Sequence, residues 1–91
     1  MVENKKIKLF AEICKGWESE SYKLAFLSLI DELKKENIET LYEIEEIEDN
    51  SLEVYVVKNS LKTKVFSRKL TGKWLNDSNI QIVLKKIKEL L

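Results

Sequence analysis

The pattern of apolar and polar residues predicts a strand and then a long helix in the first third of the chain. Residues Lys6 to Ile13 alternate between apolar and polar side chains, and a period of two indicates a β-strand. Phe10 lies on the otherwise polar side of this alternation, which indicates an interior strand with both faces at least partly covered. From roughly Ser19 to Glu36, apolar residues recur every three or four positions, as in an amphipathic helix. We expect Ser19, or alternatively Ser21, to cap this helix and Asn37 to end it.

Three further strands and a second helix are expected in the rest of the chain. Thr40 to Glu48, Leu52 to Val57 and Lys62 to Leu70 have the composition of strands. The alternation slips at residues 45–47, which indicates a bulge or the end of the strand. The last helix is expected over Ser78 to Leu90, because Ser78 followed three residues later by Gln81 matches a capping box.

This order of elements, β-α-β-β-β-α, predicts an α/β fold. The first two strands should be parallel, since a helix connects them, and the last two should form an antiparallel hairpin. A four-stranded mixed sheet packed by two helices would bury the apolar face of each helix. A length of 91 residues predicts a single domain over residues 1–91.

Composition limits the classes of function that remain open. The 44% hydrophobic content is typical of a folded globule. The sequence contains no apolar run long enough to span a membrane, and its polar start does not resemble a signal peptide, so we expect a cytoplasmic protein. The formal net charge is zero, which argues against a protein that binds the phosphates of nucleic acids.

Charged residues are nevertheless segregated along the chain. From Glu36 to Glu53 there are eight acidic residues and no basic one, whereas from Lys58 to Lys73 there are six basic residues and no acidic one. One interpretation is that two solvated strand faces attract each other across the sheet. The other is a basic docking surface for a protein partner that includes Lys64, Arg68 and Lys69.

Catalytic chemistry is restricted by the absence of histidine. Without histidine, the Ser-His-Asp and Cys-His arrangements and most zinc sites are excluded. Cys14 is the only cysteine, so neither an internal disulfide nor a thiolate metal cluster can form. We therefore expect no metal and no cofactor, and any redox chemistry must use Cys14 alone or with a partner molecule.

Cys14 lies between the first strand and the first helix, where it has two interpretations. As a nucleophile it would gain from the helix dipole and from Lys15, although nearby glutamates oppose a thiolate. As a structural residue it would be a small buried apolar side chain. Lys15 and Gly16 shape the turn, and Trp17 stands three residues after the cysteine, where two-cysteine redox motifs carry their second sulfur.

A later segment carries a resemblance to a known family. Val65–Trp74 has an apolar pair, a serine, a basic pair and a glycine-basic-aromatic loop, and it resembles the strand-to-loop segment of the selenoprotein W/T/H-like (Rdx) family of small thioredoxin-like proteins. The segment from Asn50 to Val54 looks like the start of a strand in that family. The resemblance aligns Cys14 with the first redox cysteine, and it implies a thioredoxin-like fold and thiol redox activity. The second redox residue is replaced by Trp17.

Two functions follow from these observations. The first is a thiol redox protein in which Cys14 acts on a partner disulfide, glutathione or a peroxide. The alternative is a non-catalytic interaction module that docks a partner through its segregated charges, with Trp74 as a further contact. The chain could also be a monomer or a weak homodimer, with Leu52 to Val57 or the second strand as the exposed edge that pairs.

Overall fold

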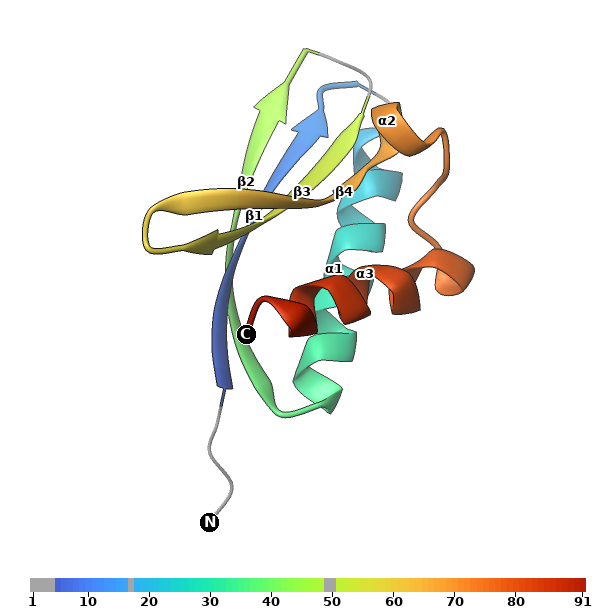
Figure 1. Ribbon diagram of the computed structural model, residues 1–91. Coiled ribbons are helices and arrows are strands. Elements are labelled where there is room, and N and C mark those ends of the chain that lie inside the picture. Colours follow the sequence, from blue (N-terminus) through green and yellow to red (C-terminus); the bar gives the residue numbers. More distant parts are fainter. Residues whose placement is uncertain (1–4, 17, 49–50) are drawn as a thin grey trace.

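Four strands, two long helices and one short helix are the elements of the described chain (Figure 1). The computed structural model describes residues 5–16, 18–48 and 51–91. In chain order, the elements are β1 (Lys5–Cys14), α1 (Ser19–Lys35), β2 (Ile38–Ile47), β3 (Leu52–Lys58), β4 (Leu61–Ser67), α2 (Arg68–Thr71) and α3 (Asp77–Glu89).

The four strands form one mixed sheet in the order β2-β1-β3-β4. β1 and β2 are parallel, whereas β3 is antiparallel to both β1 and β4. This confirms the predicted α/β class with a four-stranded mixed sheet, and the arrangement is compatible with a thioredoxin-like fold. The order of elements is also as expected, except for the short helix α2 between β4 and α3.

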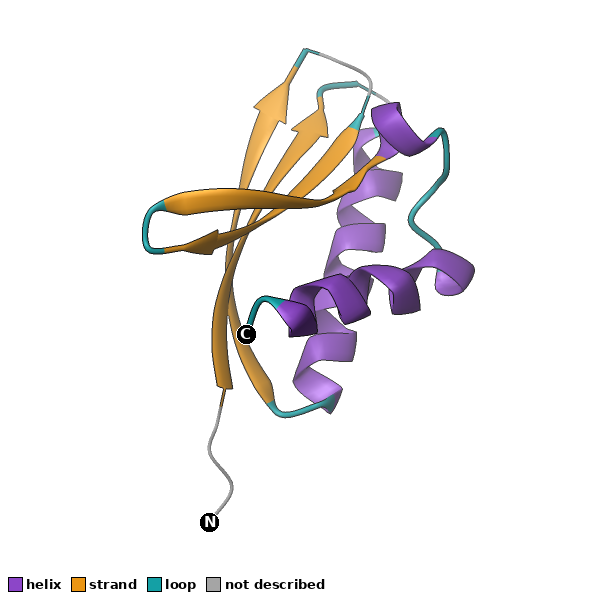
Figure 2. Cartoon of the chain, in the orientation of Figure 1, coloured by secondary structure: helices purple, strands orange, loops and turns teal. Residues whose placement is uncertain are grey.

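α1 and α3 cover the same face of the sheet (Figure 2). The side chains of β1 that point toward them, Ile7, Leu9, Ala11 and Ile13, are buried in a core shared with both helices. On the opposite face, Phe10 is buried by its neighbours on the sheet, because the Tyr55 ring lies 6.0 Å from its ring and Lys62 Nζ lies 3.7 Å above it. The sequence therefore correctly identified β1 as an interior strand.

The first helix follows its apolar stripe closely. Its buried residues are Tyr22, Phe26, Leu29, Ile30 and Leu33. Asn37 takes a left-handed conformation, with φ of 61°, and ends the helix as predicted. The predicted cap was wrong: Glu18 occupies the N-cap, because the Ser19 N–H already donates to the Gly16 carbonyl and the helical turns start one residue earlier.

Two capping residues in the last third of the chain also differ from the prediction. The fourth strand ends at Ser67 and not at Leu70, because the Ser67 hydroxyl accepts a hydrogen bond from the Leu70 N–H and starts α2. Asn76, rather than Ser78, caps α3, and its side chain accepts hydrogen bonds from the N–H groups of Ser78 and Asn79. Both residues satisfy backbone donors that a helix start leaves open.

The edges of the sheet are β2 and β4. Leu52 to Val57 was one of two candidate edges, but it belongs to β3, which pairs with β1 on one side and β4 on the other. β2 is an edge strand, as the other candidate required. β2 pairs regularly with β1 up to Ile47, so the predicted slip of the alternation at residues 45–47 marks the end of the strand and not a bulge. The pairing of β3 with β4 is irregular, with a shift of register between Val54 and Tyr55.

The charged segments lie mostly in β2 and β4, at opposite edges of the sheet, so attraction between them across neighbouring strands is limited to one ion pair of the described residues. The acidic β2 pairs instead with lysines of β1, through Lys6–Glu39 at 3.7 Å and Lys8–Glu43 at 3.2 Å. Only Lys64–Glu53, at 3.9 Å, joins the two segments among the ion pairs of the described residues. None of the helices in the described ranges has the length and apolar character needed to cross a membrane.

Candidate functional site

Cys14 is the last residue of β1, and its side chain is buried. Only 2% of the residue is exposed to solvent, and its N–H donates to the Ser51 carbonyl at 3.1 Å. Burial raises the pKa of the thiol above its ordinary value of 9.0, the charge of Glu18 raises it further, and backbone hydrogen bonds at Ser51 and Cys14 lower it by less. The protonated thiol is therefore favoured, which fits the structural interpretation of this cysteine better than the nucleophilic one.

Among the described residues of the predicted redox turn, neither Lys15 nor Gly16 lowers the pKa of the thiol. Lys15 is exposed, and its Nζ pairs with Glu48 Oε1 at 3.3 Å. Gly16 has φ of 132°, a backbone conformation that favours glycine. Trp17, the position of the missing second redox residue, lies outside the described residues.

Aromatic and cationic side chains are stacked beside the N-terminus of α1. The rings of Tyr22 and Trp74 are 5.1 Å apart and inclined by 24°, and the Arg68 guanidinium lies 4.9 Å from the centre of the Trp74 ring. Burial and then the charge of Glu18 raise the pKa of Tyr22 most, and the charge of a Cys14 thiolate would raise it further. This stack brings together Arg68 and Trp74, two of the residues predicted to bind a partner, and it involves them in packing.

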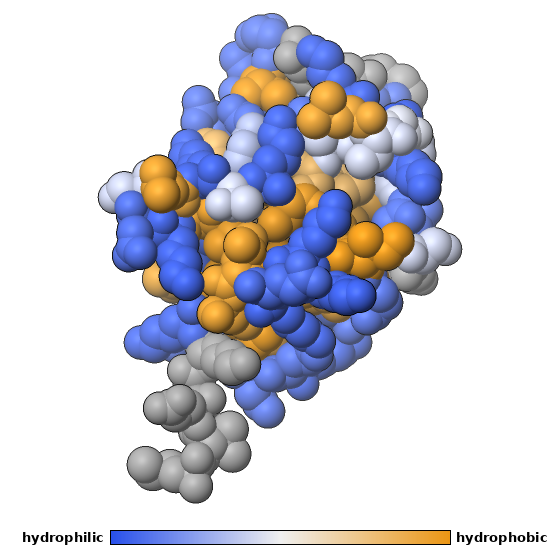
Figure 3. Space-filling model, in the orientation of Figure 1, coloured by the Kyte–Doolittle hydropathy of each residue, from blue (hydrophilic) through white to orange (hydrophobic). Residues whose placement is uncertain are grey.

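A groove lies beside β4, and we call it the β4 groove. Its volume is about 490 Å³. β4 forms one side of the groove, α2 and the following loop close one end, and α3 forms the other side. The lining residues are Lys64, Val65, Phe66, Ser67, Leu70, Thr71, Lys73, Asn79, Ile82, Val83 and Lys86. Figure 3 shows apolar side chains gathered between the β3–β4 hairpin and α3, with hydrophilic side chains around them.

The β4 groove combines apolar surface with one sign of charge. Leu70 and Ile82, two large apolar residues of the lining, are 76% and 55% exposed, and exposed apolar surface in a groove is typical of a binding site. Lys64, Lys73 and Lys86 are the charged residues of the lining, which among the described residues includes no carboxylate. The groove is therefore suited to a ligand that carries both apolar and acidic groups.

Only part of the β4 groove consists of residues predicted to bind a partner. Lys64 was predicted as a partner-binding residue and does line it. Lys69 is exposed and lies instead beside a second hollow, on the open face of the sheet. Lys73, Lys86 and Ile82 line the groove but were not predicted to bind a partner. Ile82 could have been found from the sequence, because it is an apolar residue outside the buried stripe of its helix.

Comparison of the chain with protein-family models, with curated proteins and with solved structures gave no match. The resemblance to the selenoprotein W/T/H-like family therefore stays a prediction. In the described part of the chain, no group of three or more potential metal-ligating side chains is found. The β4 groove, rather than Cys14, is the candidate functional site with the clearest physical character.

Proposed function

We propose that this protein is an interaction module that binds an extended acidic segment of a protein partner in the β4 groove. The observation that carries this proposal is the composition of the groove, where exposed Leu70 and Ile82 lie among three lysines. An alternating segment of apolar and acidic residues would place its apolar side chains over the floor and its carboxylates near the ammonium groups. Complementary charges of this kind give specificity and speed up association.

The position of β4 supports binding of a segment in an extended conformation. β4 is an edge strand, so within the described residues no strand pairs with its outer N–H and C=O groups. An added strand would satisfy these groups, and its alternate side chains would point toward the groove. Main-chain hydrogen bonds would then supply affinity, while the lysines would select acidic sequences.

Thiol redox activity at Cys14 is the alternative, and the geometry favours it less. A nucleophilic cysteine needs a thiolate that a substrate can reach. Cys14 is 2% exposed and its pKa is raised, so both requirements are opposed. The interaction module needs no reactive thiol.

Titration of a labelled synthetic peptide tests the proposal. The peptide alternates valine and glutamate, and a matched peptide carries serine in place of every glutamate. We expect the acidic peptide to bind and the serine peptide not to bind, with amide chemical-shift changes at β4 and α3. Raising the salt concentration should weaken binding, because exposed charges are screened.

Charge-reversal variants locate the binding site. Lys73→Glu combined with Lys86→Glu should weaken binding by about 30-fold, if each reversal costs about 1 kcal/mol. Lys85→Glu is the control, because Lys85 lies next to Lys86 on the same helix, is exposed and does not line the groove. Equal binding of both peptides, or equal effects of Lys86→Glu and Lys85→Glu, would contradict the proposal.

A further inference from the structure

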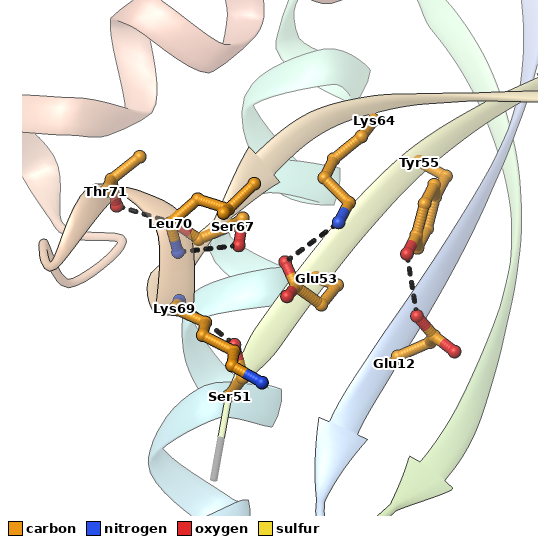
Figure 4. A network of polar contacts seen from close by, with 9 residues as sticks. All are labelled: Glu12, Ser51, Glu53, Tyr55, Lys64, Ser67, Lys69, Leu70 and Thr71. Atoms are coloured by element: carbon orange, nitrogen blue, oxygen red, sulfur yellow. Dashed lines mark hydrogen bonds and ion pairs between the residues drawn. The ribbon is translucent and has the colours of Figure 1, made fainter. Parts of the chain in front are cut away.

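A second hollow lies on the open face of the sheet, and we call it the sheet hollow. Its volume is about 470 Å³, and its lining includes Glu12, Glu53, Tyr55, Lys64 and Lys69. It is separate from the β4 groove except that Lys64 and Leu70 line both. Figure 4 shows the side chains of Glu12, Glu53, Tyr55 and Lys64 together on this face of the sheet.

Two glutamates lie opposite each other on neighbouring strands in the sheet hollow. Glu12 of β1 is paired in register with Glu53 of β3. Like charges that lie directly opposite each other in a sheet destabilise it. The Tyr55 hydroxyl donates to Glu12 Oε1 at 2.8 Å, and this bond holds the first carboxylate in place.

The carboxylate of Glu53 is buried and incompletely satisfied. Its side chain is only 10% exposed, and within the described residues Oε2 has no hydrogen-bond partner. The nearest cation, Lys64 Nζ, lies 3.9 Å from Oε2, which is beyond hydrogen-bond distance. A buried oxygen in this state carries a desolvation penalty that a charged N–H donor would remove.

The electrostatic effect of both carboxylates reaches the tyrosine. The pKa of Tyr55 is raised to about 12. Burial is the largest cause, the hydrogen bond to Glu12 is the next, and the charges of Glu12 and Glu53 follow. The charges of Glu12 and Glu53 are part of what disfavours a negative charge at the tyrosine oxygen, and these two charges would stabilise a positive group placed near it.

We propose that the sheet hollow binds a guanidinium group, such as an arginine side chain of a ligand, between the carboxylates of Glu12 and Glu53. The planar guanidinium carries donors in a fork, so that one edge can reach each carboxylate. The Lys64 side chain covers Glu53 only loosely and is 37% exposed, so it moves aside when the guanidinium enters. This site does not depend on the function of the β4 groove.

N-acetyl-arginine amide tests the site, with N-acetyl-citrulline amide as the neutral probe of the same shape. Binding is followed by amide chemical shifts of the full chain. We expect a Kd of about 1–10 mM for the arginine probe, with shifts confined to the hollow, and no saturable shifts with the citrulline probe. N-acetyl-lysine amide should bind more weakly, since an ammonium group lacks the fork.

Substitutions distinguish binding of the arginine probe in the sheet hollow from nonspecific attraction of a cation to acidic residues. Glu53→Gln should weaken binding of the arginine probe at least tenfold, and Tyr55→Phe should weaken it about threefold by releasing Glu12. Glu39→Gln is the control, because it removes the same charge from an exposed position on β2. A native-like spectrum of each variant establishes that it folds. Equal shifts with the arginine and citrulline probes, or unchanged binding in Glu53→Gln, would overturn the proposal.

Discussion

The burial of Cys14 predicts that its thiol reacts only when the protein opens. In the fold the residue is 2% exposed, and the raised pKa keeps the thiol protonated. A disulfide reagent must reach a thiolate, so the native protein should react far more slowly than the unfolded chain. In the assay, the disulfide reagent is added to the unmodified protein at neutral pH.

The size of the effect follows from the stability of the fold. Domains have free energies of unfolding of about 0.05–0.15 kcal/mol per residue, so a chain of 91 residues should have at least about 5 kcal/mol. If Cys14 becomes accessible only through unfolding, the reactive fraction is then about 2 × 10⁻⁴. The labelling rate should fall by a factor of at least about 10³ relative to an exposed thiol.

An exposed reference thiol makes the measurement interpretable. The variant with Cys14→Ser and Ser28→Cys moves the only thiol to an exposed position on α1. Labelling of both proteins is followed by absorbance at increasing urea concentrations. The rate for Cys14 should rise exponentially with urea and converge with that of the reference, since urea increases the open fraction.

Fast labelling would refute this reasoning. If Cys14 reacts within a factor of ten of the Ser28→Cys reference in the absence of urea, the thiol is reached in the folded state. Thiol redox activity would then become the better proposal. Slow labelling that does not respond to urea would point to local opening and not to global unfolding as the route to the sulfur.

Two further predictions concern stability. Asn76→Ala should lower the free energy of unfolding by about 1 kcal/mol, because the Asn76 side chain accepts the backbone hydrogen bonds at the start of α3. Ser78→Ala should change the free energy of unfolding by less than about 0.5 kcal/mol. Urea titration measures both values, and equal losses would contradict the assignment of Asn76 as the cap. The melting temperature should fall as the pH rises from about 10 toward 12, because the unfolded chain releases the Tyr55 proton near 10.0 and the folded chain retains it to about 12. Tyr55→Phe should reduce this fall in melting temperature. An identical pH profile in the variant would show that Tyr55 is not the cause of the fall.

Local patterns predicted the elements of this fold well, because each long element has a strong periodicity. The stripe of α1 and the alternation of β1 each repeat over several turns or residue pairs, so a single exception such as Phe10 does not obscure them. The short helix α2 was missed, because four residues are too few to show a period. Its start depends on the orientation of one serine hydroxyl, Ser67 Oγ, which sequence does not show.

The candidate sites were harder to predict, because they depend on contacts between distant segments. The environment of Cys14 includes Tyr22, which stacks on Trp74 from the far end of the chain, so its burial was not visible locally. The cross-strand pairing of Glu12 with Glu53 depends on the register of β1 and β3. Charge segregation was visible in the sequence, but only the strand order shows that most of the two charged segments lie at opposite edges of the sheet.

The acidic edge of the sheet has a consequence for how copies of this protein meet. β2 is ten residues long and exposes Leu41, so its outer backbone would otherwise be a template on which another molecule could pair. Four glutamates along the strand make two such edges repel each other. Because these glutamates are exposed, salt screens the repulsion, and the protection against aggregation weakens as the ionic strength rises.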